Sequence, residues 1–252
     1  MHGCMAYENE VNHYLNPRGE RNEVLMLQQA HQILCVSEPF RRWVAARYPQ
    51  YASKTATLTN GISWDMLSSV DADSQQRDKH CIILLGGGRI TKHNLEVCRA
   101  VERLNEMGEE KFRIVIYGPY YDNDASSALQ SMPYTIWNGS VSHEALLQAM
   151  SRASLFIQNS SFEPFSLGVI EALVSGCNVL VTQYVGAMDI IPGLTKDDII
   201  LNPLDIHEIV EKIQKVMRVG NNERLLSSID REATSSSSAA EQLYQTALLL
   251  QN

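Results

Sequence analysis

Short apolar runs alternate with longer amphipathic segments along the chain from residue 81 onward. The runs have the continuous hydrophobicity of strands buried on both faces of a sheet, and they fall at 81–85, 112–117, 135–137, 154–158, 178–182 and 199–201. The segments between and after them carry apolar residues at helical spacing, which predicts helices at 94–107, 126–131, 142–152, 167–175, 204–219 and 235–250. This alternation predicts βαβ units, and therefore an α/β fold in which helices cover both faces of a Rossmann-like parallel sheet.

The first 76 residues show a weaker pattern, which predicts a partial and mostly helical N-terminal segment. Residues 1–20 have no convincing periodicity, so a loop-rich lead-in is expected. Asn22 is predicted to cap a helix that reaches Leu34, and Ser37 is predicted to cap a second helix that continues to Arg47. A β-type run, an Asn-Gly turn and a polar linker follow at 54–59, 60–61 and 65–77.

The composition is that of an ordinary globular protein, with 44% hydrophobic and 20% charged residues. A formal net charge of −8 argues against a general nucleic-acid binder, although local basic residues can still bind a phosphate. No apolar stretch approaches the roughly 18 residues of a membrane-spanning helix, and no signal peptide is recognisable. Five scattered cysteines without metal or redox spacing favour reduced thiols. We therefore expect a cytoplasmic protein whose contact with a membrane is at most peripheral, at its inner face.

Two carboxylates eight residues apart span a junction between a strand and a helix. Glu163 precedes a proline, which disfavours helical backbone, so it is expected in the loop. Ser166 is expected to cap the next helix, and Glu171 lies just over one turn inside that helix. The N–H groups at the start of a helix attract anions. The segment therefore predicts a ligand with hydroxyl groups at both ends and a phosphate between them.

These features are part of an ordered set of motifs that resembles the nucleotide-sugar half of GT-B glycosyltransferases, particularly the retaining enzymes of family 4. The resemblance covers roughly residues 22–219. Its motifs are Asn60-Gly61-Ile62, Gly88-Arg89 with Lys92, Gly139, Glu163 to Glu171, Ala172 with Gly176 and Val179, and Val185-Gly186. One pair of glutamates at this spacing is a weak signal, and alone the two acids are compatible with a solvated loop and helix surface. The ordered set is much more specific.

The resemblance implies a role for each charged residue. Arg89 and Lys92 bind the diphosphate of the donor and stabilise the charge that grows on the leaving group. Glu163 accepts hydrogen bonds from hydroxyls of the donor sugar, and Glu171 accepts both ribose hydroxyls. His2 stands where the family has a histidine near the reacting sugar. The other donor-binding positions that the resemblance implies are Gly88, Gly118, Asn138, Gly139, Val141, Phe165, Ser166, Leu167 and Gly168.

The resemblance also implies the reaction and its partners. A sugar passes from a nucleotide-diphosphate sugar to a glycan or lipid-linked acceptor by front-face displacement, in which the leaving phosphate helps to deprotonate the acceptor. No metal and no cofactor are expected beyond the nucleotide sugar itself. Asp71-Ala72-Asp73 matches the metal motif of another glycosyltransferase fold, but it lies in the polar linker without a preceding apolar strand. His143 follows a predicted helix cap and is expected to be a surface residue.

The chain departs from the family pattern at three places. Glu163 is followed by Pro-Phe-Ser where the family often has Gly-Phe-Gly, which stiffens the loop. The spacing from Arg89 is shorter than usual, so the lysine role is assigned to Lys92 with His93 or Asn94 in the neighbouring position. Compared with the family pattern, about half of the acceptor domain, a whole βαβ part, is absent before residue 1. We therefore expect an acceptor-domain remnant and linker, a nucleotide-sugar-binding domain, and a C-terminal helix that packs back toward the N-terminal segment, at 1–76, 77–232 and 233–252.

Three functions remain open from the sequence. The first is a retaining glycosyltransferase, or its donor-binding portion. The second is a non-catalytic module or subunit that binds a nucleotide sugar and needs a missing N-terminal domain or a partner subunit for its acceptor site. The third, a sugar-nucleotide epimerase of similar fold, is less favoured because paired glutamates at this spacing are typical of transferases.

Overall fold

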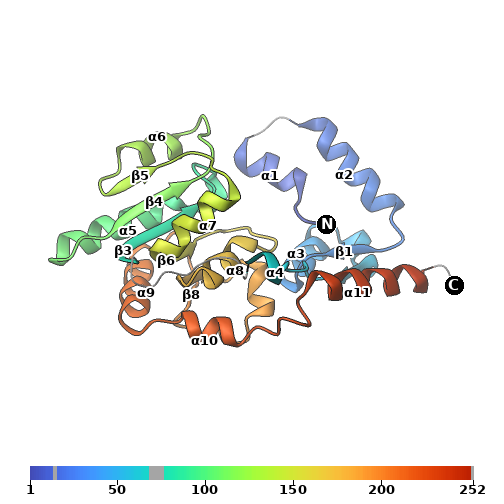
Figure 1. Ribbon diagram of the computed structural model, residues 1–252. Helices are drawn as coiled ribbons and strands as arrows, with labels where there is room; N and C mark the ends of the chain where they lie inside the picture. The colour runs from blue at the N-terminus through green and yellow to red at the C-terminus, as the bar shows by residue number, and fades with distance from the viewer. Residues whose placement is uncertain (14–15, 68–76, 251–252) are drawn as a thin grey trace.

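A six-stranded parallel sheet forms the centre of the larger unit in the computed structural model, which describes residues 1–13, 16–67 and 77–250 (Figure 1). Its order is β5-β4-β3-β6-β7-β8, and every neighbouring pair is parallel. The strands are β3 (Asp78–Leu85), β4 (Arg113–Tyr117), β5 (Thr135–Trp137), β6 (Ala153–Gln158), β7 (Asn178–Thr182) and β8 (Ile199–Ile200). The predicted α/β fold with a parallel sheet is therefore confirmed.

Helices cover both faces of this sheet, as predicted. They are α5 (Asn94–Met107), α6 (Asp124–Ser131), α7 (His143–Arg152), α8 (Leu167–Val174), α9 (Ile206–Val219) and α10 (Asn222–Ser227). Side chains alternate along each strand, so Leu155 and Ile157 of β6 pack with α5 and α9 in one core. Phe156 points to the opposite face and packs with Val169 and Ile170 of α8. A fully buried side chain of this size stabilises the fold by about 1.5–3 kcal/mol.

The strand order reverses direction between β3 and β6. From β3 the chain moves outward to β4 and β5, and it then returns to place β6 on the other side of β3. Such a switch point opens a crevice at the carboxyl ends of the two central strands, where α/β sheets bind ligands. The segments that follow β3 and β6 begin with Gly86 and Asn159. They are therefore the place to look for a site.

A smaller unit contains the N-terminal part of the chain and the C-terminal helix. It has a parallel pair of strands, β1 (Ile33–Cys35) and β2 (Thr55–Thr57). Its helices are α1 (Met5–Asn12), α2 (Pro17–Gln29), α3 (Glu38–Arg47), α4 (Trp64–Leu67) and α11 (Ser236–Leu249). Figure 1 shows α11 in red beside the blue N-terminal elements, where the N–H of Ser236 bonds to the carbonyl of Ile62 at 3.0 Å. The described residues also include three 3₁₀ helices: η1 (Pro49–Lys54), η3 (Ile90–Lys92) and η4 (Gly186–Ile190).

The prediction for the first 35 residues is wrong in three respects. The expected lead-in loop contains α1 and the start of α2, and the cap of α2 is Asn16 rather than Asn22. The Asn16 side chain accepts a bond from the N–H of Gly19 at 2.9 Å, and Pro17 occupies the first turn, where proline is favoured. The helix ends at Gln29, because residues 33–35 pair with β2 as a buried strand.

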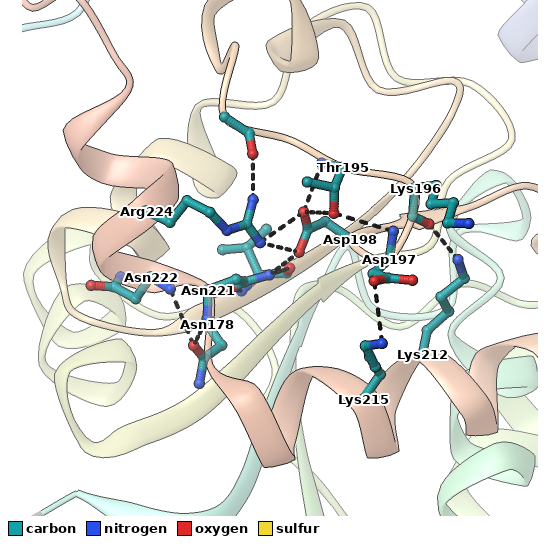
Figure 2. Close-up of polar contacts among 12 residues, drawn as sticks. Asn178, Thr195, Lys196, Asp197, Asp198, Lys212, Lys215, Asn221, Asn222 and Arg224 are labelled. Carbon is teal, nitrogen blue, oxygen red and sulfur yellow. Dashed lines mark hydrogen bonds and ion pairs between the residues drawn. The ribbon is translucent and has the colours of Figure 1, made fainter.

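Helix α10, which the sequence pattern did not predict, is joined to the sheet by a polar network around the buried Asp198 (Figure 2). Asp198, at the amino end of β8, accepts hydrogen bonds from Thr195, Asn221 and Arg224 at 2.8–3.0 Å. Asn221 also bonds to both backbone groups of Val179 in β7. The network lies at the amino edge of the sheet, opposite to the carboxyl edge where a ligand site is expected, and we interpret it as structural.

Candidate functional site

A glycine-rich turn after β3 is in backbone contact with the loop after β4. Gly86, Gly87 and Gly118 have φ angles of 95°, 57° and 128°, in the left-handed region that favours glycine. A Cβ atom on Gly87 would lie 2.1 Å from the carbonyl oxygen of Pro119, so a side chain has no room there. The buried amide of Asn94 donates to the carbonyl of Gly87 at 2.8 Å and holds the turn at the start of α5.

We expect Gly87→Ala to lower the free energy of unfolding by about 2–3 kcal/mol, because it adds both left-handed strain and a backbone clash. Gly139→Ala separates the two effects, since Gly139 has a φ angle of 68° but no atom within 4 Å of an added Cβ. That variant should lose only about 1 kcal/mol. Urea unfolding measures both values. Equal losses in the two variants would contradict the close approach of the two loops.

Lys92 and Glu163 form an ion pair that joins the loop after β3 to the loop after β6. Their side chains are only 14% and 16% exposed. The stem of Lys92 runs across Gly86, whose added Cβ would lie 2.7 Å from Cγ of the lysine. Two groups that are 71 residues apart in the sequence therefore meet at the carboxyl edge of the sheet. The lysine assigned from the motif spacing is the one that reaches Glu163.

The neighbouring His93 has a different environment. Its backbone is left-handed, with a φ angle of 46°, and its buried Nε2 atom has no hydrogen-bond partner among the described residues. Burial lowers the pKa of His93, although the nearby Glu96 carboxylate acts in the opposite direction. Burial therefore favours the neutral form of the imidazole beside Lys92. The amide of Asn94, the other residue considered for this position, donates to the carbonyl of Gly87 in the glycine-rich turn.

Gln158 holds the Glu163 loop, and sequence reasoning missed it. This buried residue ends β6, and its amide donates to Oε2 of Glu163 at 3.2 Å and to Oγ of Ser160 at 2.7 Å. The expected capping role of Ser166 is wrong. Ser166 has a φ angle of 81°, and its hydroxyl donates to Oε1 of Gln158 at 3.3 Å instead of capping α8. A polar residue at the end of an otherwise apolar strand was the signal that could have identified Gln158.

Glu171 is held by a residue of the neighbouring helix. Nε2 of His143 lies 2.9 Å from Oε1 of Glu171, whose side chain is 15% exposed. His143 was expected only as a surface residue; its side chain is 52% exposed, but it also contacts a predicted site residue. The predicted cap of α7 is confirmed, because Oγ of Ser142 accepts a bond from the N–H of Ala145 at 3.2 Å.

Arg89 lies at the same edge of the sheet, in the turn after β3. Its guanidinium contacts Tyr121, which follows β4: Nη2 is 3.4 Å from the hydroxyl oxygen, and the carbon Cζ is 6.0 Å from the ring centroid. The structure therefore places Arg89, Lys92 and Glu163 on loops that border the switch point between β3 and β6. Glu171 follows on the first helix after β6.

The remaining predicted donor-binding residues lie along this edge. The N–H of Gly118 bonds to the carbonyl of Gly139 at 2.8 Å, which joins the loops after β4 and β5. Asn138 contacts the hydroxyl of Tyr117 at 3.4 Å, and Val141 is exposed. At the start of α8, Phe165 is buried, Leu167 is exposed, and Gly168 packs against the end of β3. Gly88 packs against α6.

His2 lies in a different environment from the other predicted catalytic residues. It is exposed and lines a cavity of about 600 Å³ between α1, α2 and β1, together with apolar side chains such as Met26 and Leu27. Within the described part of the chain, no hydrogen bond or ion pair joins His2 to Lys92 or Glu163. The catalytic assignment of His2 stays a prediction.

The N-terminal unit is nevertheless fastened to the Glu163 loop. The hydroxyl of Ser37, the confirmed cap of α3, donates to the carbonyl of Pro164 at 2.6 Å. Phe162 of the same loop packs between Tyr7 of α1 and Trp43 of α3. The centroid of its ring lies 4.7 Å from that of Tyr7 and 4.9 Å from that of Trp43. Both units therefore contribute to the surroundings of the candidate site.

The candidate metal motif at Asp71 and Asp73 lies outside the described residues. Among residues 1–13, 16–67 and 77–250, no group of three or more His, Cys, Asp or Glu side chains is placed to hold a metal ion. In those same ranges, none of the helices combines the length and the apolar character that crossing a membrane requires.

Comparison with known proteins finds relatives of similar sequence and similar fold. The sulfoquinovosyl transferase SQD2 of Arabidopsis thaliana is 27% identical over 150 residues, which make up 58% of this chain and 29% of that protein. Sucrose-phosphate synthase from Thermosynechococcus elongatus has a similar fold, with a TM-score of 0.75 and 18% identity over 99% of this chain and 66% of that one. Anabaena Alr3699/HepE, solved in complex with UDP and glucose, has a TM-score of 0.67 and 14% identity over 93% of this chain and 68% of that one.

The matched part of this chain thus spans less than a third of the length of sulfoquinovosyl transferase SQD2 and about two thirds of the length of the sucrose-phosphate synthase. The fold likeness confirms the expected GT-B architecture. The sequence profile of the family described as "Glycosyl transferases group 1" matches residues 71–233, which include every predicted charged site residue except His2. The chain therefore belongs to the glycosyl transferases group 1 family.

Proposed function

We propose that the chain is a retaining, family 4-like glycosyltransferase, or the donor-binding portion of one. It transfers a hexosyl-type sugar from a nucleotide-diphosphate sugar to a glycan or lipid-linked acceptor without a metal ion or other cofactor. One observation carries the proposal: Lys92 and Glu163 meet at the switch point of a parallel sheet, and Glu171 follows on the adjoining helix. The relatives that contain UDP and glucose, or that are named as sugar transferases and synthases, support an activated sugar as the donor.

The cationic groups suit the diphosphate. Lys92 and Arg89 approach from the loop after β3, and the first turn of α8 presents backbone N–H groups that attract anions. In the free protein Lys92 is neutralised by Glu163. A bound diphosphate would compete for Lys92, so Glu163 would become available to the hydroxyls of the sugar. The two halves of the donor are thereby recognised by one pair of residues.

The reaction that we propose breaks the bond between the sugar's anomeric carbon and the phosphate oxygen. The acceptor oxygen forms its new bond to the same carbon on the same face. The proton of the acceptor hydroxyl moves to an oxygen of the leaving diphosphate. Negative charge grows on that diphosphate in the transition state, where Lys92 and Arg89 stabilise it.

A second function has its own supporting observation. The N-terminal unit contains a two-stranded sheet within the described residues, and beside it lies the cavity of about 600 Å³ that His2 lines. The chain also spans only part of its relatives. The small sheet and the cavity beside it favour a nucleotide-sugar-binding module or subunit that needs a separate acceptor domain, as an alternative to an autonomous enzyme.

A panel of UDP, ADP and GDP sugars separates the two functions. Titration calorimetry identifies the nucleotide that binds, and release of the nucleoside diphosphate in the presence of glycan or lipid-linked acceptors measures transfer. Binding with turnover supports the autonomous enzyme, whereas binding without turnover supports the module. If none of the nucleotides binds, both proposals are wrong.

We expect Glu171→Ala to weaken binding of the nucleoside diphosphate by about 1–3 kcal/mol, the range for hydrogen bonds to a charged group. Glu163→Ala should leave the affinity for the bare nucleotide nearly unchanged but weaken binding of the nucleotide sugar. The matched control is Glu110→Ala, which removes an exposed carboxylate that also contacts a histidine. Equal losses for nucleotide and nucleotide sugar in Glu163→Ala would contradict its assignment to the sugar.

A further inference from the structure

We propose that His143 is a positioning residue that holds the Glu171 carboxylate ready for the ribose of the donor. The inference deepens the proposed function and depends on it, since it takes Glu171 to be the ribose-binding group. The observation behind it is the contact of 2.9 Å between Nε2 of His143 and Oε1 of Glu171, which joins α7 to α8. Neither the sequence pattern nor the motif set assigned a ligand-related role to His143.

The two side chains are anchored on elements that hold them in place. Helix α7 begins at a capped end, and its Met150 is fully buried in the core that also contains Val169 and Ile170 of α8. Glu171 immediately follows Ile170 in the sequence. His143 is the first residue of its helix, and it lies within the capping turn in which the N–H of Ala145 donates to Oγ of Ser142. The contact therefore joins two packed helices rather than two flexible surface loops.

The hydrogen-bonding capacity of the carboxylate allows this contact and ribose binding together. An ionised carboxylate has about four lone-pair sites, and His143 uses one of them, on Oε1. For Oε2, the described part of the chain records no hydrogen-bond partner. Two ribose hydroxyls can therefore bond to Glu171 while His143 stays in place. The terminal torsion of a glutamate is broad, so a fixed hydrogen-bond donor on one oxygen reduces the number of orientations that must be given up when ribose binds.

The location of His143 also suits this role. It is two residues beyond Val141, in the segment that leaves the loop after β5, which contains three of the donor-binding positions that the resemblance implies. Half of its side chain is exposed, whereas the side chain of Glu171, which it contacts, is only 15% exposed. A nucleoside whose base contacts the Asn138–Val141 loop would bring its ribose to the Glu171 carboxylate beside the imidazole. His143 would thus connect base recognition to ribose recognition.

Calorimetry with paired ligands tests the inference. The probes are whichever of UDP, ADP and GDP the unmodified chain binds most tightly, and the 2′,3′-dideoxy form of that same nucleotide. We expect His143→Ala to weaken binding of the ribonucleotide by about tenfold, the effect of one hydrogen bond to a charged group. The dideoxy nucleotide lacks the hydroxyls that Glu171 would bind, so its affinity should change less than about twofold. His143→Gln, which retains an N–H donor, should recover most of the loss.

The control is His80→Ala. His80 contacts Glu110 at 3.0 Å, nearly the same geometry, but it lies toward the amino end of β3, away from the site. Its substitution should leave both affinities unchanged. Unchanged or tighter ribonucleotide binding by His143→Ala would overturn the inference. Tighter binding would mean that the imidazole competes with ribose for the Glu171 carboxylate. Equal losses for both nucleotides would overturn it as well. If the unmodified chain binds none of the three nucleotides, the proposed function itself is wrong.

Discussion

Replacing Asp198 by alanine is expected to lower the free energy of unfolding by about 3 kcal/mol, because the buried Asn221 amide and two further hydrogen-bond donors would lose their charged partner. The Asp198 side chain is 2% exposed and accepts bonds from Thr195, Asn221 and Arg224 (Figure 2). Asn221 is itself buried, so water cannot replace the lost oxygen without rearrangement. Arg224 is 42% exposed and can be solvated, which limits the loss. Urea unfolding at neutral pH measures the difference.

Asp197→Ala is the matched control for this prediction. The neighbouring carboxylate pairs with Lys215 at 3.4 Å, but both side chains are well exposed. Exposed ion pairs contribute about 0–1 kcal/mol, so this variant should be nearly as stable as the unmodified chain. A similar loss in both variants would show that the polar network around Asp198 does not stabilise α10 against the sheet.

The stabilisation by Asp198 should also depend on pH. Burial alone would raise the pKa of Asp198, but the hydrogen bonds from Arg224, Asn221 and Thr195 outweigh it and hold the pKa below its ordinary value. Because the pKa is lower in the folded than in the unfolded state, the contribution is complete above the unfolded pKa of about 3.9 and is lost as the pH falls through the folded pKa. The stability difference between the unmodified chain and Asp198→Ala should therefore be constant near neutral pH and shrink below about pH 4. A difference that shrinks above about pH 6 would contradict this assignment.

The sheet could be predicted from the sequence because its strands are buried on both faces. A parallel strand in that position is a continuous apolar run, and the predicted bounds of β5 and β7 match the structure. The amphipathic pattern of α5 was equally clear, since seven of its residues are buried. Continuous burial leaves a local signal, and a local signal can be read without knowledge of the neighbours.

The N-terminal unit lacks such a signal. Strand β1 has three residues, and it becomes a strand only because β2 pairs with it from 20 residues farther along. Among the side chains of helix α1 that the structure describes, only the polar Asn9 is buried, so the helix shows no apolar face. Elements of this kind depend on tertiary contacts more than on propensity. Their sequence pattern therefore resembled a loop.

The candidate site divides in the same way. The meeting of Lys92 and Glu163 follows from a general rule, because carboxyl ends of parallel strands share one edge and the motif order supplied the residues. The left-handed backbone of Ser166 could not be predicted, since a serine in a Ser-Leu-Gly sequence is also a good helix cap. The contact between His143 and Glu171 depends on how two helices pack, which a sequence pattern does not specify.

The proposed contact between Lys92 and the donor diphosphate gives the largest functional prediction. We expect Lys92→Ala to reduce sugar transfer by about 100-fold or more, as removal of one preorganised donor to a developing negative charge does in other enzymes. The loss should fall on kcat more than on KM, because the charge on the leaving diphosphate grows in the transition state. Release of the nucleoside diphosphate from the donor sugar that binds most tightly measures both constants. Lys215→Ala removes an exposed lysine of the same domain and should leave transfer unchanged.

A second measurement of the same variant needs no turnover, so it applies equally if the chain is a binding module. Lys92→Ala should lower the affinity for a nucleoside diphosphate by about tenfold more than the affinity for the corresponding monophosphate. The monophosphate lacks the second phosphate group, so it has fewer charged contacts with Lys92 to lose. Removal of Lys92 also leaves Glu163 without its charged partner at a site that is mostly buried, which should cost about 1–2 kcal/mol of folding stability. Thermal unfolding therefore accompanies the titration. Equal losses for the two nucleotides in a folded variant would assign the diphosphate to Arg89 and the first turn of α8 instead, and Lys92 would then serve mainly to hold Glu163.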